Sequence, residues 1–215
     1  MNYNDEVGEK MNISNLLRKY FIMGSQNCPR DPEIILQESI KGGITAFQFR
    51  EKGTGSLTGE EKVTLGKRLR EICREHGVPF IINDDIELVK MLDVDGIHVG
   101  QDDTPPEKIK EKYPDLLIGL SISNEAELQR SNLDVIDYVG AGPVFSTTTK
   151  EDAKQAVGLN WIESLRERYP TLPIVGIGGI NEANSKQVLE AGADGVAFIS
   201  VVTQAEDIIE TVQKL

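Results

Sequence analysis

Cysteines and long apolar runs are scarce in this sequence, and each shortage excludes a class of protein. Cys28 and Cys73 are the two cysteines among 215 residues, too few for a disulfide framework or a paired zinc motif. We therefore expect reduced thiols and a cytoplasmic protein. No apolar run approaches the roughly 18 residues that a membrane span requires. Residues 1–18 lack the layout of a secretory signal, so we expect a short leader followed by a single domain at 19–215.

Positive charge is also in short supply. The chain has 23 lysines and arginines against 35 aspartates and glutamates, a formal net charge of −12. This balance argues against general binding to nucleic acids, whose phosphates require a positive field. We expect small molecules as partners, with neither nucleic acid nor membrane, and a homo-oligomer stays open. Any phosphate must bind in a local cationic pocket within an acidic body.

Eight short apolar runs alternate with amphipathic, helix-like segments along the chain. The runs occupy residues 20–24, 44–49, 78–83, 95–100, 116–121, 136–142, 172–179 and 193–200. Such alternation predicts βαβ units around a parallel sheet, and eight units predict a closed (β/α)₈ TIM barrel. A doubly wound open sheet is the alternative, but no GxGxxG turn follows the first run. Because barrel chemistry sits where strands end, the strand ends are the place to look for a site.

The second run ends in a polar, cationic row. Side chains alternate along a strand, so Gln48, Arg50 and Lys52 share one face while Phe47 and Phe49 share the other. We expect the phenylalanines to face the helices and the polar row to face the barrel mouth, where it would suit an anion. Charges that merely solvate an exposed loop are the alternative interpretation.

Carboxylates follow the third and fourth runs. Asn83, Asp84 and Asp85 end the third, and Asp102 and Asp103 follow the fourth. Helix capping is the ordinary role of such residues, and Asp85 is the better capping candidate. Two carboxylates on neighbouring loops also match Mg²⁺, which takes oxygen ligands and leaves room for waters and phosphates. The sequence therefore indicates a metal at Asp84 and Asp103.

The last three runs end in hydroxyls and glycines. The sixth leads into Ser146–Lys150, the seventh ends in "GIGGI" before a helix expected to start near Asn181, and the eighth ends in "FISVV". Glycines and free amides after the seventh and eighth strands form the recurring phosphate site of these barrels. A flexible polar loop and a tight turn are the plainer alternatives.

These motifs together resemble one known family. "QFREK", "NDD", "GIHVGQDD", "GPVFSTTTK" and "VGIGGI" through "GVAFIS", in this order from about Tyr20 to the end of the chain, are similar to thiamine-phosphate synthase. The resemblance implies an enzyme that joins 4-amino-2-methyl-5-hydroxymethylpyrimidine diphosphate to 4-methyl-5-(2-phosphoethyl)thiazole. The products would be thiamine monophosphate and pyrophosphate, and Mg²⁺ the cofactor.

The resemblance also implies three groups of site residues. The pyrimidine diphosphate would be held by Gln48, Arg50, Lys52, Asn83, Ser121 and Lys150, with Arg50, Lys52, Ser121 and Lys150 as the catalytic set. The thiazole phosphate would be held by Thr147, Thr149, Gly179, Ile199 and Ser200. Asp84 and Asp103 would hold the metal. Ser123 and Ser146 differ from the common pattern, which has His and Pro at these positions.

The family's chemistry, as the resemblance implies it, is loss of pyrophosphate followed by capture of the pyrimidine-methyl cation by the thiazole nitrogen. Such chemistry needs no side-chain nucleophile, and we interpret His98, inside the fourth run, as a satisfied core histidine. A thiazole tautomerase-type paralogue and a non-catalytic barrel that binds a phosphate ligand remain as alternatives.

Overall fold

A closed barrel of parallel strands forms the centre of the protein. The structure, a computed structural model, describes residues 13–149 and 155–215. The strands are β1 (Lys19–Met23), β2 (Ala46–Phe49), β3 (Phe80–Asn83), β4 (Gly96–Val99), β5 (Leu117–Ile122), β6 (Tyr138–Ala141), β7 (Ile174–Ile177) and β8 (Gly195–Phe198). Each pairs in parallel with the next, and β8 pairs with β1. All eight lie within or overlap the apolar runs, and the predicted (β/α)₈ barrel is confirmed.

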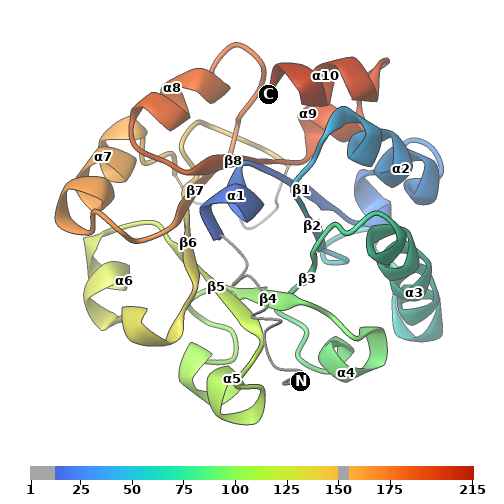
Figure 1. Ribbon diagram of the computed structural model, residues 1–215, viewed down its shortest axis with the longest axis horizontal. Coiled ribbons are helices and arrows are strands. Elements are labelled where there is room, and N and C mark those ends of the chain that lie inside the picture. The colour runs from blue at the N-terminus through green and yellow to red at the C-terminus, as the bar shows by residue number, and fades with distance from the viewer. Residues whose placement is uncertain (1–12, 150–154) are drawn as a thin grey trace, which may run out of the picture.

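Helices surround this barrel as an outer ring (Figure 1). The described helices are α1 (Ile13–Leu17), α2 (Pro32–Gly42), α3 (Gly59–Glu75), α4 (Leu88–Leu92), α5 (Pro106–Lys112), α6 (Glu125–Arg130), α7 (Leu159–Arg168), α8 (Ser185–Glu190), α9 (Ser200–Thr203) and α10 (Ile208–Lys214), with 3₁₀ turns η1 (Ser25–Asn27) and η2 (Leu133–Val135). Of these, α1 lies over the middle of the barrel and not in the ring. Within the two described ranges, no helix has the length and apolarity that crossing a membrane needs.

Local sequence signals explain where α2 begins and ends, but not where α8 begins. The Asp31 carboxylate accepts a hydrogen bond from the Glu33 amide at 2.8 Å, and Gly43 ends α2 with a φ of 98°. The expected start of a helix near Asn181 is wrong. Asn184 Oδ1 accepts from the Asn181 amide at 2.8 Å, which builds a separate turn and delays α8 to Ser185.

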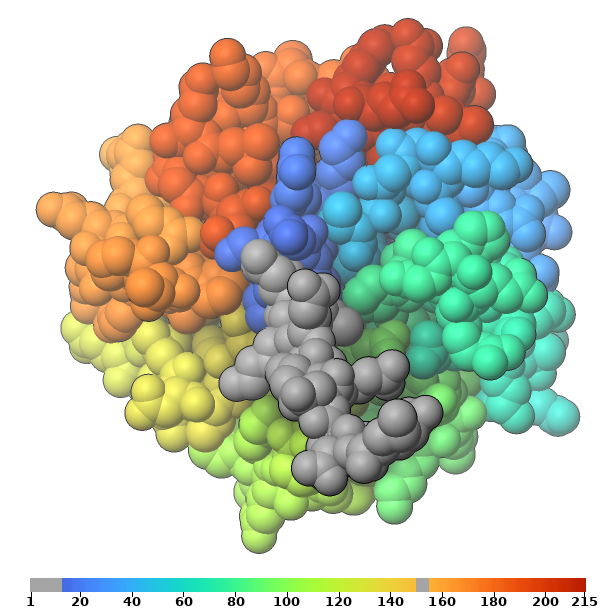
Figure 2. Space-filling view, viewed as in Figure 1, coloured from blue at the N-terminus to red at the C-terminus, as the bar shows by residue number. Residues whose placement is uncertain are grey.

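Apolar side chains pack on both surfaces of the barrel wall. Phe47 and Phe49 lie in the larger cluster, between strands and helices, whereas Tyr20, Ile81 and Tyr138 belong to a cluster inside the barrel. This matches the predicted outward direction of the phenylalanines. The helix α1 closes one end of the barrel and adds its buried leucines to the inner cluster. In Figure 2 the blue residues, to which α1 belongs, lie near the centre of a face ringed by the outer helices.

Polar side chains tie the strand beginnings together in pairs. The residue that closely precedes each even-numbered strand accepts a hydrogen bond from a backbone amide at or near the start of the odd-numbered strand before it. The pairs are Thr45 with Lys19, Asp95 with Phe80, Asp137 with Ile118 and Asp194 with Ile174, at 2.7–2.8 Å. These bonds lie at the end of the barrel opposite the carboxyl ends of the strands. Side chains at that end are expected to stabilise the fold and not to take part in catalysis.

The clearest stability prediction concerns Asp137. Its carboxylate accepts from the Ile118 amide at 2.8 Å, and the change Asp137→Ala leaves this buried donor unpaired. We expect the free energy of unfolding to fall by about 1.5–3 kcal/mol, the range for bonds to charged groups. The control is Asp115→Ala, at an exposed position, and denaturant unfolding is the measurement. Equal losses in the two variants would contradict this role of Asp137.

Candidate active site

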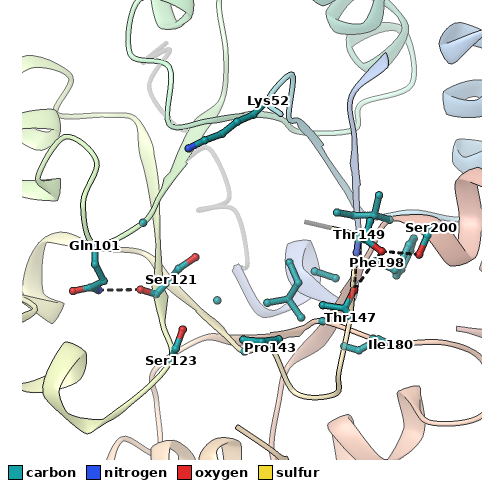
Figure 3. Close-up of a pocket in the computed structure, with 18 of the residues that line it drawn as sticks. Lys52, Gln101, Ser121, Ser123, Pro143, Thr147, Thr149, Ile180, Phe198 and Ser200 are labelled. Atoms are coloured by element: carbon teal, nitrogen blue, oxygen red, sulfur yellow. Dashed lines mark hydrogen bonds between the residues drawn. The ribbon is translucent and has the colours of Figure 1, made fainter. Parts of the chain in front are cut away.

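A cavity of about 310 Å³ opens at the carboxyl ends of the strands. Its wall combines residues from the loops after most of the strands, as the barrel geometry requires. Figure 3 shows Gln101 and Ser121 on one side and Thr147 and Ser200 on the other, with Lys52 reaching in from the loop after β2. The volume is within the range of small-molecule sites.

The predicted row after β2 divides between the barrel interior and the cavity. Gln48 is buried, and its amide Nε2 donates to the Tyr20 hydroxyl at 2.9 Å. The Arg50 amide donates to the Met23 carbonyl at 2.9 Å, and the residue is only 6% exposed. Lys52 alone of the three lies in the cavity wall. The row therefore passes from the interior toward the mouth instead of lying wholly at the mouth.

Glu51, which sequence reasoning passed over, fixes this loop. The residue is 7% exposed, and its carboxylate accepts from the Ser25 amide at 2.8 Å, the Ser25 hydroxyl and the Leu57 amide at 2.6 Å. These bonds join the loops after β1 and β2, and so they set the backbone that carries Arg50 and Lys52. The sequence signal for this residue was a single acidic side chain between two cationic ones, in "REK".

The carboxylates after β3 and β4 lie on adjacent loops, because these strands are neighbours in the barrel. Asn83 is the last residue of β3, and Asp84 follows with a φ of 48°. The Asp84 carboxylate forms an ion pair with Lys52. Asp103 lies in the cavity wall, and its Oδ2 accepts from the Gly100 amide at 2.7 Å. Both acids are thus oriented by the protein itself.

Asp85 does not occupy the capping position expected of it. Its carboxylate accepts from the Glu87 amide at 3.2 Å and forms an ion pair with Lys62 at 2.7 Å. The N-cap of α4 is Glu87, which makes no side-chain cap. The prediction that Asp85 caps this helix is therefore wrong, because the carboxylate stabilises the turn before the helix.

The donor chemistry here fits magnesium better than a transition metal. Among residues 13–149 and 155–215, no group of three or more His, Cys, Asp or Glu side chains comes together as a metal site. Zinc sites in proteins usually require such a group. Magnesium is often bound by one or two carboxylates together with waters and substrate phosphates. Asp84 and Asp103 supply two carboxylates on neighbouring loops.

Hydroxyls and glycines form the opposite wall. Thr149 Oγ1 lies 3.1 Å from Ser200 Oγ, and the Thr149 amide donates to Thr147 Oγ1 at 3.2 Å. Ser200 opens the short helix α9 directly after β8, and the first amides of a helix have no acceptor within it. This is the layout of the recurring phosphate site of these barrels.

The glycine pair after β7 is required by the backbone and by the space around it. Gly178 and Gly179 have φ values of 100° and 64°, a region that side chains with a Cβ rarely adopt. A Cβ on Gly179 would lie 2.7 Å from the Ser146 carbonyl oxygen and 2.8 Å from the Phe145 Cβ. The chain after β6 therefore packs directly against this turn.

Two serines, Ser121 in β5 and Ser123 directly after it, line the cavity on the side opposite Thr147 and Ser200, which is called the first wall below. Ser121 Oγ lies 2.9 Å from His98 Nε2, and the Ser121 carbonyl accepts from Gln101 Nε2 at 2.9 Å. Ser123 donates its backbone amide to the buried Glu127 carboxylate at 2.8 Å. Gln101 was missed by sequence reasoning, although it precedes the aspartates in "QDD".

The structure brings most of the predicted site residues to one place. Those in the cavity wall are Lys52, Asp103, Ser121, Thr147, Thr149, Gly179, Ile199 and Ser200. Gln48, Arg50, Asn83 and Asp84 are not part of the wall, although the ion pair with Lys52 connects Asp84 to it. Lys150 lies outside the described residues. The roles assigned to all of them stay predictions.

Neither cysteine is suited to covalent chemistry. Cys28 and Cys73 are free thiols, and burial raises the pKa of each to about 12, with Glu51 and Asp31 adding to the effect at Cys28. Because the thiolate is the reactive form, alkylation should be slow and should still accelerate above about pH 9, where an ordinary thiol levels off. Alkylation rates measured by mass spectrometry, with unfolded protein as the control, test this. A plateau near that pH in the folded protein would contradict it.

Known proteins resemble the chain over nearly its whole length. The sequence pattern of the family described as thiamine monophosphate synthase matches residues 19–202. The thiamine-phosphate synthase of Oceanobacillus iheyensis is 58% identical over 200 residues, which cover 93% of this chain and 97% of that protein. The thiamine-phosphate synthase of Bacillus cereus is 50% identical over 206 residues, which cover 96% and 94%.

Solved structures show the same relationship. Thiamine phosphate pyrophosphorylase from Pyrococcus furiosus aligns with a TM-score of 0.84 at 35% identity, covering 95% of this chain and 96% of that one. Phosphoribosyl anthranilate isomerase from Thermotoga maritima aligns with a TM-score of 0.65 at 13% identity, covering 92% and 96%. The second likeness shows a shared fold alone.

Proposed function

The chain belongs to the thiamine monophosphate synthase family, and from this membership we propose how its cavity carries out the family's reaction. The enzyme is a transferase of thiamine biosynthesis. It joins 4-amino-2-methyl-5-hydroxymethylpyrimidine diphosphate to 4-methyl-5-(2-phosphoethyl)thiazole and forms thiamine monophosphate and pyrophosphate.

One observation supports the proposal most strongly: a single cavity has two walls of different chemistry. Lys52 contributes a cation and Ser121 a hydroxyl on one side, where Asp103 is the proposed metal ligand, and Thr149 and Ser200 contribute hydroxyls on the other. A diphosphate needs cations, whereas a monoester can be held by hydroxyls and backbone amides. The pyrimidine diphosphate therefore binds at the first wall and the thiazole phosphate at the second.

The residues of the first wall stabilise the departing pyrophosphate. Negative charge grows on that group as the carbon–oxygen bond breaks. Lys52 in the wall would offset it, together with Arg50, which lies outside the wall two residues before Lys52, and Lys150, which lies outside the described residues. Lys52 forms an ion pair with Asp84, which positions its ammonium at the cavity. Fixed charges of this kind need no reorganisation during the reaction.

The residues of the second wall position the nucleophile. Thr147, Thr149 and Ser200 hold the phosphate of the thiazole, together with the backbone at Gly179 and Ile199. Anchoring the tail aims the thiazole nitrogen at the methylene carbon of the pyrimidine, and such positioning lowers the entropy cost of the encounter. Asp84 and Asp103 would hold Mg²⁺, with Asn83 beside them, and the bound ion would neutralise charge on the diphosphate.

The competing tautomerase function predicts a different product. Incubation of the enzyme with thiazole phosphate alone should leave that compound unchanged, and addition of the pyrimidine diphosphate and Mg²⁺ should give thiamine monophosphate. Chromatography with mass and ultraviolet detection separates the outcomes. An isomerised thiazole phosphate in the first incubation would support the tautomerase instead.

Thr149 offers a test of the second wall. Thr149→Val keeps the shape of the side chain and removes the hydroxyl that lies 3.1 Å from Ser200 Oγ. We expect the KM for thiazole phosphate to rise about ten- to a hundredfold, the effect of one lost hydrogen bond to a charged group. The KM for the pyrimidine diphosphate should change little. Thr148→Val is the matched control, since Thr148 is exposed and the cavity wall does not include it.

If Thr149→Val instead raised the KM for the pyrimidine diphosphate alone, the two walls would be assigned in reverse.

The cytoplasmic location inferred from the cysteines and a homo-oligomeric state remain predictions about this enzyme.

A further inference from the structure

A chain of hydrogen-bonded side chains crosses the barrel interior beneath the cavity. Gln48 Nε2 lies 2.9 Å from the Tyr20 hydroxyl, which lies 2.8 Å from the Tyr138 hydroxyl. The Tyr138 hydroxyl lies 3.2 Å from His98 Nδ1, and His98 Nε2 lies 2.9 Å from Ser121 Oγ. The chain ends at a hydroxyl in the cavity wall. It therefore connects the buried interior with the proposed diphosphate side of the site.

Each phenol in the chain keeps its proton. Tyr20 and Tyr138 are each 1% exposed, and burial raises the pKa of both well above the ordinary value of a phenol. Each hydroxyl therefore has one proton to donate and can accept from another partner. Because each hydroxyl has a single proton, the direction of donation along the hydrogen-bonded chain can be derived by assigning one proton to each link.

The direction follows from the end at Gln48. An amide nitrogen can only donate, so the Tyr20 oxygen accepts from Gln48 and its proton goes to the Tyr138 oxygen. Tyr138 then donates to His98 Nδ1, which must carry no proton. In a neutral imidazole the other nitrogen carries it, and His98 Nε2–H donates to Ser121 Oγ. The Ser121 proton then points to a partner outside the chain.

Two glycines make room for this arrangement. A Cβ on Gly119 would lie 2.4 Å from His98 Nδ1 and 2.5 Å from the Tyr138 hydroxyl oxygen. A Cβ on Gly140 would lie 2.9 Å from the His98 Cε1. Strands β5 and β6 thus lack side chains at the points where the imidazole and the phenol meet. The backbone accommodates the rings in this orientation.

We propose that Tyr138, supported by Tyr20 and Gln48, holds His98 as the neutral Nε2–H tautomer and thereby makes the Ser121 hydroxyl a hydrogen-bond donor to the substrate. Tyr138 and His98 are then positioning residues, because they act through Ser121. Only the last step, donation to the pyrimidine diphosphate, rests on the proposed function.

The direction matters because of the substrate's chemistry. Diphosphate oxygens and pyrimidine ring nitrogens accept hydrogen bonds and do not donate them. If Ser121 donated its proton to His98, its oxygen would present a lone pair to such an acceptor, and the two oxygen or nitrogen lone pairs would repel each other. With His98 donating to it, Ser121 has its own proton available for the acceptor.

The tautomer can be read directly by nitrogen NMR. The chain contains two histidines, His76 and His98, so ¹⁵N-histidine labelling gives a simple spectrum. His76 is an internal reference, because its Nδ1 lies 2.9 Å from the Ile72 carbonyl oxygen and must donate to it. At a pH where both rings are neutral, the ligand-free enzyme should show opposite tautomers, with His98 as Nε2–H. His76→Gln assigns the signals.

Two phenylalanine variants separate the links of the chain. Tyr138→Phe removes the donor to His98 Nδ1, and the His98 signals should lose the pure Nε2–H pattern. Tyr20→Phe should keep that pattern, because Tyr138 can still donate to the ring. Circular dichroism checks the fold of both. An Nδ1–H tautomer or an imidazolium in the wild-type enzyme would overturn the proposal, as would an unchanged His98 spectrum in folded Tyr138→Phe.

Steady-state kinetics test the effect on the substrate. Tyr138→Phe should lower kcat/KM for the pyrimidine diphosphate about tenfold, in line with one misdirected hydrogen bond to a charged group, and leave the KM for thiazole phosphate unchanged. Tyr113→Phe, at the C-cap of α5 and outside the cavity wall, is the control. The NMR result needs no substrate, so failure of the proposed function would leave the tautomer assignment standing. A correct tautomer with unchanged kinetics in Tyr138→Phe would refute the role of Ser121 as the donor.

Discussion

Asp84→Asn and Asp103→Asn should each lower kcat/KM at least about a hundredfold, which corresponds to about 2.7 kcal/mol of transition-state stabilisation. Asparagine removes the charge and keeps the structure. It tolerates the left-handed backbone that Asp84 adopts at a φ of 48°, and its side-chain oxygen can still accept from the Gly100 amide as Asp103 does. Loss of rate therefore reports the carboxylate charge and not a collapsed loop.

The neighbouring acid supplies a matched control. Asp85→Asn breaks the ion pair with Lys62 but leaves an oxygen for the Glu87 amide, and it should keep nearly full activity. Raising the Mg²⁺ concentration should recover part of the rate in the Asp84 and Asp103 variants, but should not change Asp85→Asn. Wild-type turnover in either Asp84→Asn or Asp103→Asn would contradict the assignment of these acids to the metal.

Gly179→Ala should lower kcat/KM for thiazole phosphate at least about thirtyfold, or about 2 kcal/mol. The methyl group would lie 2.7 Å from the Ser146 carbonyl oxygen, and the φ of 64° is unfavourable for alanine by about 1–2 kcal/mol. The turn at Gly179 must shift, and the second wall, which contains Thr147, shifts with it. We expect a raised KM for thiazole phosphate to account for most of the loss in kinetic measurements.

A second glycine separates strain from function. Gly192 also has a positive φ, 106°, but it precedes β8 at the opposite end of the barrel, where a Cβ would meet the Arg166 side chain. Gly192→Ala should therefore destabilise the protein without raising the KM for thiazole phosphate. Equal KM values in folded Gly179→Ala and Gly192→Ala would show that Gly179 does not shape the second wall.

Periodicity in the sequence was enough to predict the barrel and the strand ends. Strands alternate in-facing and out-facing residues, so Phe47 and Phe49 could be placed toward the helices, as the structure confirms. After the last residue of a strand, this alternation no longer predicts the direction of a side chain. β2 ends at Phe49, and the paths of Arg50, Glu51 and Lys52 depend on bonds to the loop after β1. Burial of Arg50 and Glu51 could not be foreseen for that reason.

Contacts across the barrel were beyond sequence reasoning for a different cause. Whether Tyr20, Tyr138 and His98 meet depends on the register of strands far apart in the chain and on the glycines that leave space for the rings. His98 was expected to be a satisfied core histidine. Both of its ring nitrogens have hydrogen-bond partners, but the residue is half-buried, and those partners could not be named from the sequence. The ion pair between Lys52 and Asp84 likewise requires two loops to be placed in space.

One time course tests most directly whether this cavity joins the two substrates. Purified enzyme receives both substrates and Mg²⁺, and pyrophosphate and thiamine monophosphate are measured in the same samples, with and without EDTA. We predict equal amounts of the two products rising together, both stopping on chelation and resuming when Mg²⁺ is restored. Pyrophosphate without thiamine monophosphate, or neither product from folded protein, would contradict the claim that this cavity joins the two substrates.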